Sequence, residues 1–455
     1  MKRSLAFIGM LMALLSLCAL SVAADGEPAL WPAYAPSEGL WGYIREDGSW
    51  GIAPQYADAY GFVNGYAIVR AEGADGIIDE TGAYVLPPEY TIWEGTVGFD
   101  GREGNGVYIV TQDDLSGWFD TESGFFSGMN WAFVESYDAS PYVLASVDRD
   151  ASTFAHRATG ELLLPLQDMF SYGFHEGVAV VSTGDDETVL VALDGSVTPL
   201  QEGLTAADSY VCDGLLPVTD ASGLYGYVDT VGQVAIALRF TEAGNFRCGH
   251  AVVNDGLLID RTGRVIAEDV QHVCGPWAAG DQSLAGDQSL AGGRSPAGNQ
   301  SLSIAVERAG CWAVLNADGT ERFRIPLAPY AYGRSIITYP PLAEEAPCWV
   351  GYAYGGGGIH FGLMTAEGEW LADPSDKAER LSLDNDVFSG DPMGWQGTGY
   401  AGGYVDLYGN EVFPVQWNYA EHFDGALARV WLNEDWTAAG YINRDGEMVY
   451  QWTEE

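Results

Sequence analysis

The chain has 455 residues, of which 64 are Asp or Glu and 20 are Lys or Arg, so its formal net charge at pH 7 is −44. A surface this acidic repels phosphate backbones and anionic lipid headgroups, which argues against nucleic acid or a membrane surface as a partner. Six cysteines are too few to build a scaffold on disulfides, so packed hydrophobic cores must supply the stability.

Residues 1–24 have the pattern of a secretory signal peptide. Two basic residues precede an apolar run from Leu5 to Leu20, and small residues stand just before Asp25. The alternative is an uncleaved membrane anchor, but this run is shorter than the about 20 residues that a span prefers. We therefore expect an exported protein with a lead at 25–38 and no membrane span after cleavage.

One short pattern then recurs down the chain, and its clearest copy is Leu224–Ile236. Side chains alternate over Tyr225–Val228 as in a strand with one buried face, and Asp229 can accept a hydrogen bond from the backbone two residues on. Gly232 supplies the positive φ that closes a turn. The pattern predicts a β-hairpin. A strand of the form Gly-x-Ala-x-Val follows and is expected to pair with the strand after it.

The turn glycine marks eleven copies of this unit, most of them about three dozen residues apart. The glycines are Gly48, Gly82, Gly124, Gly160, Gly195, Gly232, Gly263, Gly319, Gly368, Gly409 and Gly446. A recurring period indicates an array of equal units. We predict an all-β fold over 39–455, built from three- to four-stranded antiparallel meanders. Because one meander is marginal alone, each must bury its faces against its neighbours. A propeller-like arrangement is favoured, and an open β superhelix is the alternative.

Three segments interrupt the period. Residues 279–302 contain four related hexapeptides rich in Gly, Ser and Ala, a composition that cannot offset the entropy of ordering and predicts a flexible surface loop. Copies eight and nine carry long connections, at Pro326–Pro347 and Asp373–Gly399.

The first copy reads Trp41-Gly42-Tyr43-Ile44 with Asp47-Gly48, Pro54, Tyr56, Phe62, Gly65, Ala67 and Val69. This segment resembles the bacterial WG β-repeat, as do Gly226–Val253 and Gly403–Val430, and the resemblance extends over about 39–452. It implies an exported or surface-located interaction module, and it offers no catalytic residues to transfer.

Five cysteines follow the signal segment: Cys212, Cys248, Cys274, Cys311 and Cys348. The first three occupy nearly the same turn in successive copies. Two of them can reach bridging distance if the repeats stack directly, whereas repeats that radiate from an axis keep them apart.

The sequence contains no recognisable nucleophile, phosphate-loop or zinc motif. His175, His250 and His422 fall beside turns and are expected to face solvent rather than to bind metal. Asp384, Asp386 and Asp391 share one irregular loop, where a solvated loop is favoured over a calcium site because the spacing does not fit an EF-hand.

Aromatic residues are the remaining candidates for a binding surface. Those at repeat positions, such as Tyr227 and Tyr404, are expected to pack between sheets. The off-pattern aromatics are less well explained by the repeat and mark the first places to look for a ligand surface: Trp93, Trp131, Trp349, Trp395 and Trp417.

From these features we predict an exported, non-catalytic interaction module that binds protein or polysaccharide at the cell exterior, without cofactor or bound metal. No ligand-binding residue is assigned. Two alternatives stay open: a glycan-active enzyme that uses a pair of carboxylates as acid and base, and a purely structural surface protein.

Overall fold

A computed structural model describes residues 30–94, 106–137, 140–148, 151–184, 187–276, 303–308, 311–316, 318–325, 336–339, 348–353, 359–372, 381–382, 393–397, 402–406 and 410–454. The expected signal peptide, the hexapeptide segment 279–302 and the three aspartates at 384, 386 and 391 lie outside these residues. The described residues form strands and turns only, so none of them belongs to a helix that could cross a membrane. The all-β prediction is confirmed.

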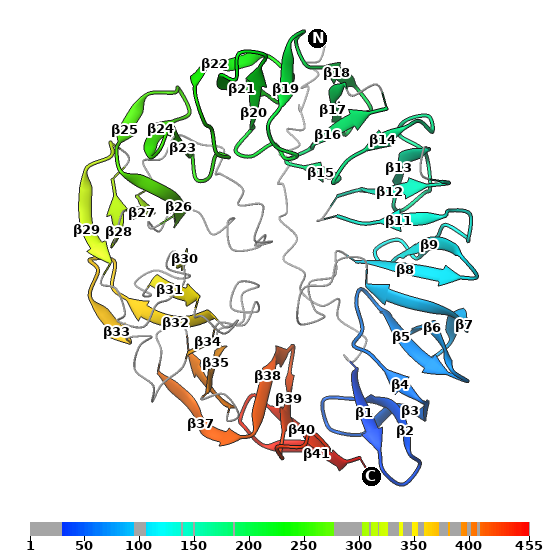
Figure 1. Cartoon of the computed structure of the whole chain (residues 1–455). Coiled ribbons are helices and arrows are strands. Elements are labelled where there is room, and N and C mark those ends of the chain that lie inside the picture. Colours follow the sequence, from blue (N-terminus) through cyan, green and yellow to red (C-terminus); the bar gives the residue numbers. More distant parts are fainter. Residues whose placement is uncertain are drawn as a thin grey trace, which may run out of the picture.

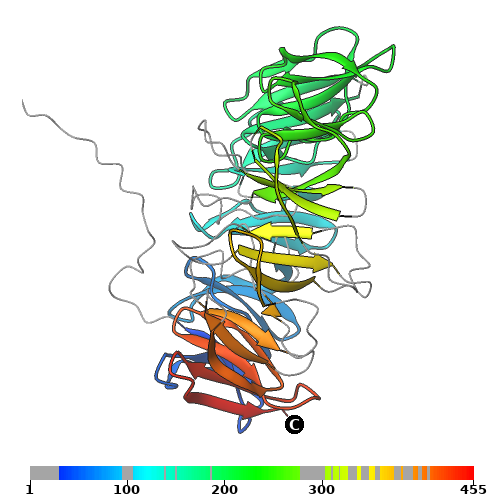
Figure 2. The same cartoon turned by 90° about the vertical axis from the view of Figure 1, so that its left-hand side faces the viewer.

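The strands are arranged as successive antiparallel meanders, here called blades, that follow one another around a ring in chain order (Figure 1). In one meander, for example, the first strand, β26 (Val270–Pro276), lies nearer the middle of the ring and the last, β29 (Glu321–Ile325), lies on its perimeter. Seen from the side, the ring is a tilted slab (Figure 2). The propeller-like arrangement, and not the open superhelix, is therefore the one observed.

The strands of blades 1 to 6 are β1 (Trp31–Ala35), β2 (Leu40–Ile44), β3 (Trp50–Tyr56), β4 (Asp58–Ala59), β5 (Tyr66–Ala71), β6 (Ala74–Asp79), β7 (Tyr84–Glu94), β8 (Val107–Gln112), β9 (Leu115–Asp120), β10 (Phe125–Phe126), β11 (Phe133–Glu135), β12 (Tyr142–Ser146), β13 (Ser152–His156), β14 (Met169–Phe170), β15 (Phe174–His175), β16 (Val178–Thr183), β17 (Thr188–Ala192), β18 (Val197–Pro199), β19 (Leu204–Ala206), β20 (Leu215–Asp220), β21 (Tyr225–Asp229) and β22 (Val234–Phe240). Blade 1 is made of β1–β3, blade 2 of β4–β7, blade 3 of β7–β10, blade 4 of β11–β13, blade 5 of β14–β18 and blade 6 of β19–β22.

The strands of blades 7 to 11 are β23 (His250–Val253), β24 (Leu257–Asp260), β25 (Val265–Ala267), β26 (Val270–Pro276), β27 (Ile304–Arg308), β28 (Cys311–Leu315), β29 (Glu321–Ile325), β30 (Ile336–Tyr339), β31 (Cys348–Ala353), β32 (Ile359–Met364), β33 (Trp370–Ala372), β34 (Leu381–Ser382), β35 (Met393–Gly397), β36 (Gly402–Asp406), β37 (Glu411–Trp417), β38 (Tyr419–Asp424), β39 (Leu427–Trp431), β40 (Ala438–Asn443) and β41 (Met448–Thr453). Blade 7 is made of β23–β25, blade 8 of β26–β29, blade 9 of β30–β33, blade 10 of β34–β37 and blade 11 of β38–β41.

Not every blade is a separate sheet. Blades 2 and 3 share a seven-stranded sheet, because β7 pairs with β6 through its first half and with β8 through its second. Pro87 and Pro88 lie within the first half, between Leu86 and Tyr90, where the pairing register with β6 shifts, and proline cannot donate a ladder hydrogen bond. Blades 9 and 10 are joined in the same way, in an eight-stranded sheet through β32 and β34.

The turns form as the sequence predicts. Ten of the eleven turn glycines lie in the described residues, and all ten have positive φ, from 70° at Gly124 to 92° at Gly368. In the sixth copy the Asp229 carboxylate accepts the backbone N–H of Val231 at 3.0 Å. The Gly-x-Ala-x-Val strands pair with the strands that follow them, as β5 does with β6 and β23 with β24.

The glycine of the Trp-Gly or Tyr-Gly pair is explained by a close approach of the last strand. A Cβ atom on Gly42 would lie 2.6 Å from the carbonyl oxygen of Ile52, and one on Gly226 would lie 2.6 Å from that of Ile236. The pairing register shifts at both places, as at a β-bulge, where glycine permits close contact.

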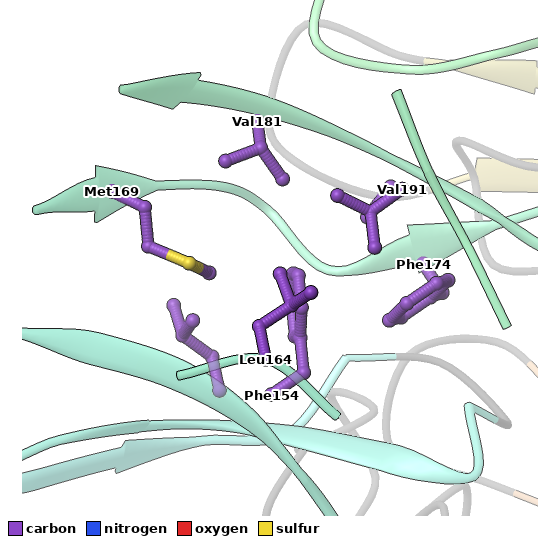
Figure 3. Packing of buried hydrophobic residues seen from close by; sticks show 8 residues of the cluster. Phe154, Leu164, Met169, Phe174, Val181 and Val191 are labelled. Atoms are coloured by element: carbon purple, nitrogen blue, oxygen red, sulfur yellow. The ribbon is translucent and has the colours of Figure 1, made fainter. Parts of the chain in front are cut away.

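The hydrophobic cores lie between consecutive blades. One side of β5 presents Ala67 and Val69 to a cluster shared with blade 1, and Ile68 on its other side enters a cluster shared with blade 3. Figure 3 shows the core between blades 4 and 5, where Phe154 and Leu164 meet Phe174 and Val191. Each blade is thus stabilised by its neighbours, as the repeat pattern predicts.

The ring closes where blade 11 meets blade 1. Trp31 and Ala33 pack against Tyr441 and Trp452 in a core of the same kind. The Trp31 indole donates to the carbonyl of Asp424 at 2.9 Å, and the Tyr441 hydroxyl donates to that of Pro32 at 2.9 Å. Among the described pairings, β1 pairs with β2 and β41 with β40. In the described residues, side-chain packing therefore holds this seam, and no strand of blade 1 pairs with a strand of blade 11.

Candidate functional site

The off-pattern tryptophans do not form one surface. Trp93 is exposed, whereas Trp131 packs beside Trp118 with ring centroids 6.2 Å apart, and Trp417 is buried against Tyr404. The side chains of Trp349 and Trp395 lie outside the described residues. The prediction is therefore wrong for Trp417, because this ring fills the core between blades 10 and 11.

The histidine prediction also needs correction. His175 and His250 are each only 8% exposed and do not face solvent. Their Nδ1 atoms contact backbone carbonyls, of Val211 and Cys248 respectively. The turns are buried because neighbouring blades pack over them. The side chain of His422 lies outside the described residues, within which no group of three or more potential metal ligands occurs.

Aromatic side chains, two of them exposed and two half-buried, gather instead on blades 4 to 6, in what we call the rim cluster. It consists of Tyr137, Phe170, Tyr172 and Tyr210. The Phe170 and Tyr172 ring centroids are 4.9 Å apart, and those of Tyr172 and Tyr210 are 5.8 Å apart. Phe170 is 56% exposed and Tyr172 is 41% exposed. All four residues lie in the segments that lead into the second strand of their blades.

Buried hydrogen bonds place the two exposed rings. The first strand of blade 5 is interrupted between β14 and β15, where the Ser171 hydroxyl donates to the Val180 carbonyl at 2.9 Å and accepts the Gly173 N–H at 3.2 Å. Met169 enters the core between blades 4 and 5 (Figure 3). Because side chains alternate along a strand, the next residue, Phe170, turns outward.

Tyr137 links blade 4 to this cluster. A Cβ atom on Gly173 would lie 2.8 Å from its ring, so the ring rests directly on the backbone of blade 5. Its hydroxyl donates to the Glu135 carboxylate. Burial, followed by the hydrogen bond to Glu135, holds the pKa of Tyr137 far above its usual value. The hydroxyl stays protonated, and one carboxylate is fixed beside the aromatic rings.

The turns next to the cluster are tied from blade to blade. The Glu176 carboxylate accepts the N–H of Asp213 at 2.9 Å and that of Gly214 at 2.6 Å. Asp213, one blade further, accepts the N–H of Gly249 at 2.6 Å. These contacts hold blades 5, 6 and 7 in register, so the rim cluster sits on a rigid support, which lowers the entropy cost of binding.

The described cysteines are free thiols, namely Cys212, Cys248 and Cys348. Burial raises the pKa of each to about 12. They are therefore protonated at neutral pH and do not act as nucleophiles there. The side chains of Cys274 and Cys311 lie outside the described residues.

The rim cluster offers flat, partly solvated rings and nearby carboxylates, a combination that can stack on a sugar face or pack against a protein segment. Sequence reasoning missed it because its residues have different offsets within their copies. Tyr172 lies five residues before Gly177, the glycine that precedes β16 in blade 5, but Tyr210 lies four residues before the corresponding glycine of blade 6, Gly214. Only packing brings them together.

Comparison with known proteins finds the repeat family. A model described as "WG containing repeat" matches residues 41–73, 225–256 and 403–436. Each match begins in the next-to-last strand of one blade and ends in the next blade. A search of curated proteins finds no match.

Several solved structures are similar at low identity. A eukaryotic initiation factor shares 10% identity over 86% of this chain and 96% of that chain, with a TM-score of 0.42. The computationally designed Ika8 protein shares 13% over 72% and 98%, with a TM-score of 0.28. BamB from Moraxella catarrhalis shares 14% over 68% and 94%, with a TM-score of 0.26.

Proposed function

The chain is a WG-containing β-repeat protein, and from this premise we propose that it is an exported, non-catalytic interaction module that binds a protein or a polysaccharide at the cell exterior. The observation that carries the proposal is the rim cluster, in which Phe170 and Tyr172 are exposed on a rigid support. The pattern of residues 1–24 supports export.

Exposed aromatic rings that contact one another favour binding over a solely structural role. Burying large rings against a partner supplies much of the free energy of association, and tyrosine is enriched at such surfaces. Glu135 and Asp208 belong to the segments that precede the second strands of blades 4 and 6. Their carboxylates can accept hydrogen bonds from hydroxyl or amide donors. The buried hydroxyl of Tyr137 is held by Glu135 and does not titrate near neutral pH.

The test compares the wild-type protein with the double variant Phe170→Ala/Tyr172→Ala on arrays of immobilised polysaccharides and purified cell-surface proteins. We expect the wild type to bind a polysaccharide or protein and the double variant to lose at least ~10-fold in affinity, as expected when central aromatic contacts are removed. Tyr60→Ala is the matched control. Tyr60 likewise lies five residues before a glycine that precedes a strand, Gly65 before β5, and it is 46% exposed.

Three outcomes would contradict the proposal. Equal binding by the wild type and the double variant would show that the rim cluster takes no part in binding. Release of reducing ends from a polysaccharide would instead support a glycan-active enzyme. Failure to bind any probe, together with abundant assembly into the envelope, would favour a structural role.

A further inference from the structure

Blade 11 carries a second group of aromatic rings, the Trp436 cluster, made of Tyr419, Trp431 and Trp436. Tyr419 begins β38 and lies opposite Trp431, which ends β39. Trp436 follows in the loop to β40, with its ring centroid 5.4 Å from that of Tyr419 and 5.3 Å from that of Trp431. It is 41% exposed. Two rings therefore support the indole while much of it stays in contact with solvent.

The backbone holds Trp436 in an unfavourable conformation. Its φ is +61°, and the other ten non-glycine residues with positive φ in the described part of the chain are Asn, Asp, Glu or Cys. A bulky side chain rarely adopts this region, and such strain concentrates at binding sites. Asn433 fixes the loop by donating to Thr437 at 2.8 Å and accepting the Ala438 N–H at 2.9 Å. The strained loop thus presents a large ring to solvent.

The surroundings of this ring are acidic. Residues 410–454 contain eight Asp and Glu residues and two arginines. Arg429 is paired with Glu421, with 2.7 Å between Nη2 and the carboxylate, and Arg444 donates to the Gly425 carbonyl at 2.6 Å. Glu434 and Asp435, directly before Trp436, are exposed. Both arginines of this segment are thus engaged, and two exposed carboxylates directly precede the exposed indole in the chain.

One cation already uses this aromatic group. The Arg429 guanidinium lies over the Trp431 ring, 5.3 Å from its centroid, and the Trp431 Nε1 donates to Glu421 at 3.2 Å. An indole, a guanidinium and a carboxylate therefore combine here within the chain. The exposed Trp436 ring, with Glu434 and Asp435 before it, provides the same indole and carboxylate chemistry for a cation from outside.

We propose that the Trp436 cluster is a binding site for a lysine or arginine side chain in a basic segment of a partner protein. The indole face attracts the cation, and Glu434 and Asp435 supply the complementary charge. The site lies on blade 11 and is independent of the rim cluster on blades 4 to 6.

The test measures the fluorescence anisotropy of a labelled hexalysine peptide mixed with the full chain. We expect Trp436→Ala to weaken binding about 5-fold, the factor that corresponds to the ~1 kcal/mol of a cation–π contact. Trp93→Ala is the control, because Trp93 is 45% exposed on β7 and is expected to leave affinity unchanged. Affinity should fall as salt rises, and uncharged maltohexaose should not bind.

A second variant separates the ring from the loop. Trp436→Asn keeps a residue that tolerates positive φ, so the melting temperature should hold while peptide affinity falls as in Trp436→Ala. Equal affinity for the wild type and both variants, equal losses in Trp93→Ala and Trp436→Ala, or maltohexaose binding that depends on Trp436 would each overturn the proposal. Because Phe170→Ala/Tyr172→Ala should bind hexalysine normally, failure of either proposed site is distinguishable from failure of the other.

Discussion

At the scale of single residues, a buried tyrosine hydroxyl links each blade of a WG match to the next. Tyr43 donates to the carbonyl of Tyr60 at 2.9 Å, and Tyr227 donates to that of Gly244 at 2.7 Å. Tyr404 donates to the carbonyl of Glu421 in the same way, and in all three the acceptor lies 17 residues later. The repeat therefore encodes the contact between blades as well as the blade.

Replacing one such hydroxyl should weaken the interface without leaving a large cavity. We expect Tyr227→Phe to lower the free energy of unfolding by about 0.5–1.5 kcal/mol, because the hydrogen bond to the Gly244 carbonyl in the next blade is lost. Chemical denaturation measures the loss. Tyr84→Phe, at a ring that is 43% exposed, should change stability little, and a Tyr227 variant as stable as this control would refute the role of the hydroxyl.

At the scale of the element, the hairpin turn depends on an acidic side chain that caps it. Asp194 accepts the N–H and hydroxyl of Ser196, and Asp318 accepts those of Thr320. These hydrogen bonds, first from the hydroxyl and then from the backbone, lower the pKa of both carboxyls below the ordinary value of 3.8. In blade 11, Asn443 caps the turn from a position two residues earlier relative to the turn glycine, and it accepts the N–H of Asp445 at 3.1 Å and that of Glu447 at 2.9 Å.

The lowered pKa values predict acid sensitivity. A carboxyl with a depressed folded-state pKa contributes stability that is present above its unfolded pKa and is lost as pH falls through the folded value. We expect the melting temperature to drop below about pH 4, and Asp194→Asn/Asp318→Asn to reduce the slope of that drop, since asparagine keeps the turn but does not titrate. Asn443→Asp should steepen it. An unchanged slope in both variants would show that these turns do not contribute.

The sequence predicts this element well because its determinants are local. The turn glycine, the capping aspartate and the alternating strand are contained within about a dozen residues around Gly232, and the structure confirms each. The sequence predicts the structure poorly where the contacting residues are far apart in the chain. The burial of His175 depends on Val211 in the next blade, and the rim cluster joins residues from three copies. Neither has a local signature.

At the scale of the whole molecule, the seam between blades 11 and 1 differs from every other interface. Consecutive blades elsewhere are connected by the chain itself, whereas in the described part of the chain blades 11 and 1 are held together by side chains such as Trp31 and Trp452. In an array stabilised by nearest neighbours, losing one interface leaves the others intact. A weakened seam should therefore open the ring before the blades unfold.

The double variant Trp31→Ala/Trp452→Ala tests this directly. Each large-to-small change should cost about 3–5 kcal/mol at the seam, so we expect a larger radius of gyration in small-angle X-ray scattering with β-sheet circular dichroism retained. The matched control is Phe154→Ala/Phe174→Ala. These rings lie 4.8 Å apart between blades 4 and 5, where the chain still connects the two blades and limits their separation. If both double variants keep the wild-type radius of gyration, or expand equally, the seam is not the weak point of the ring.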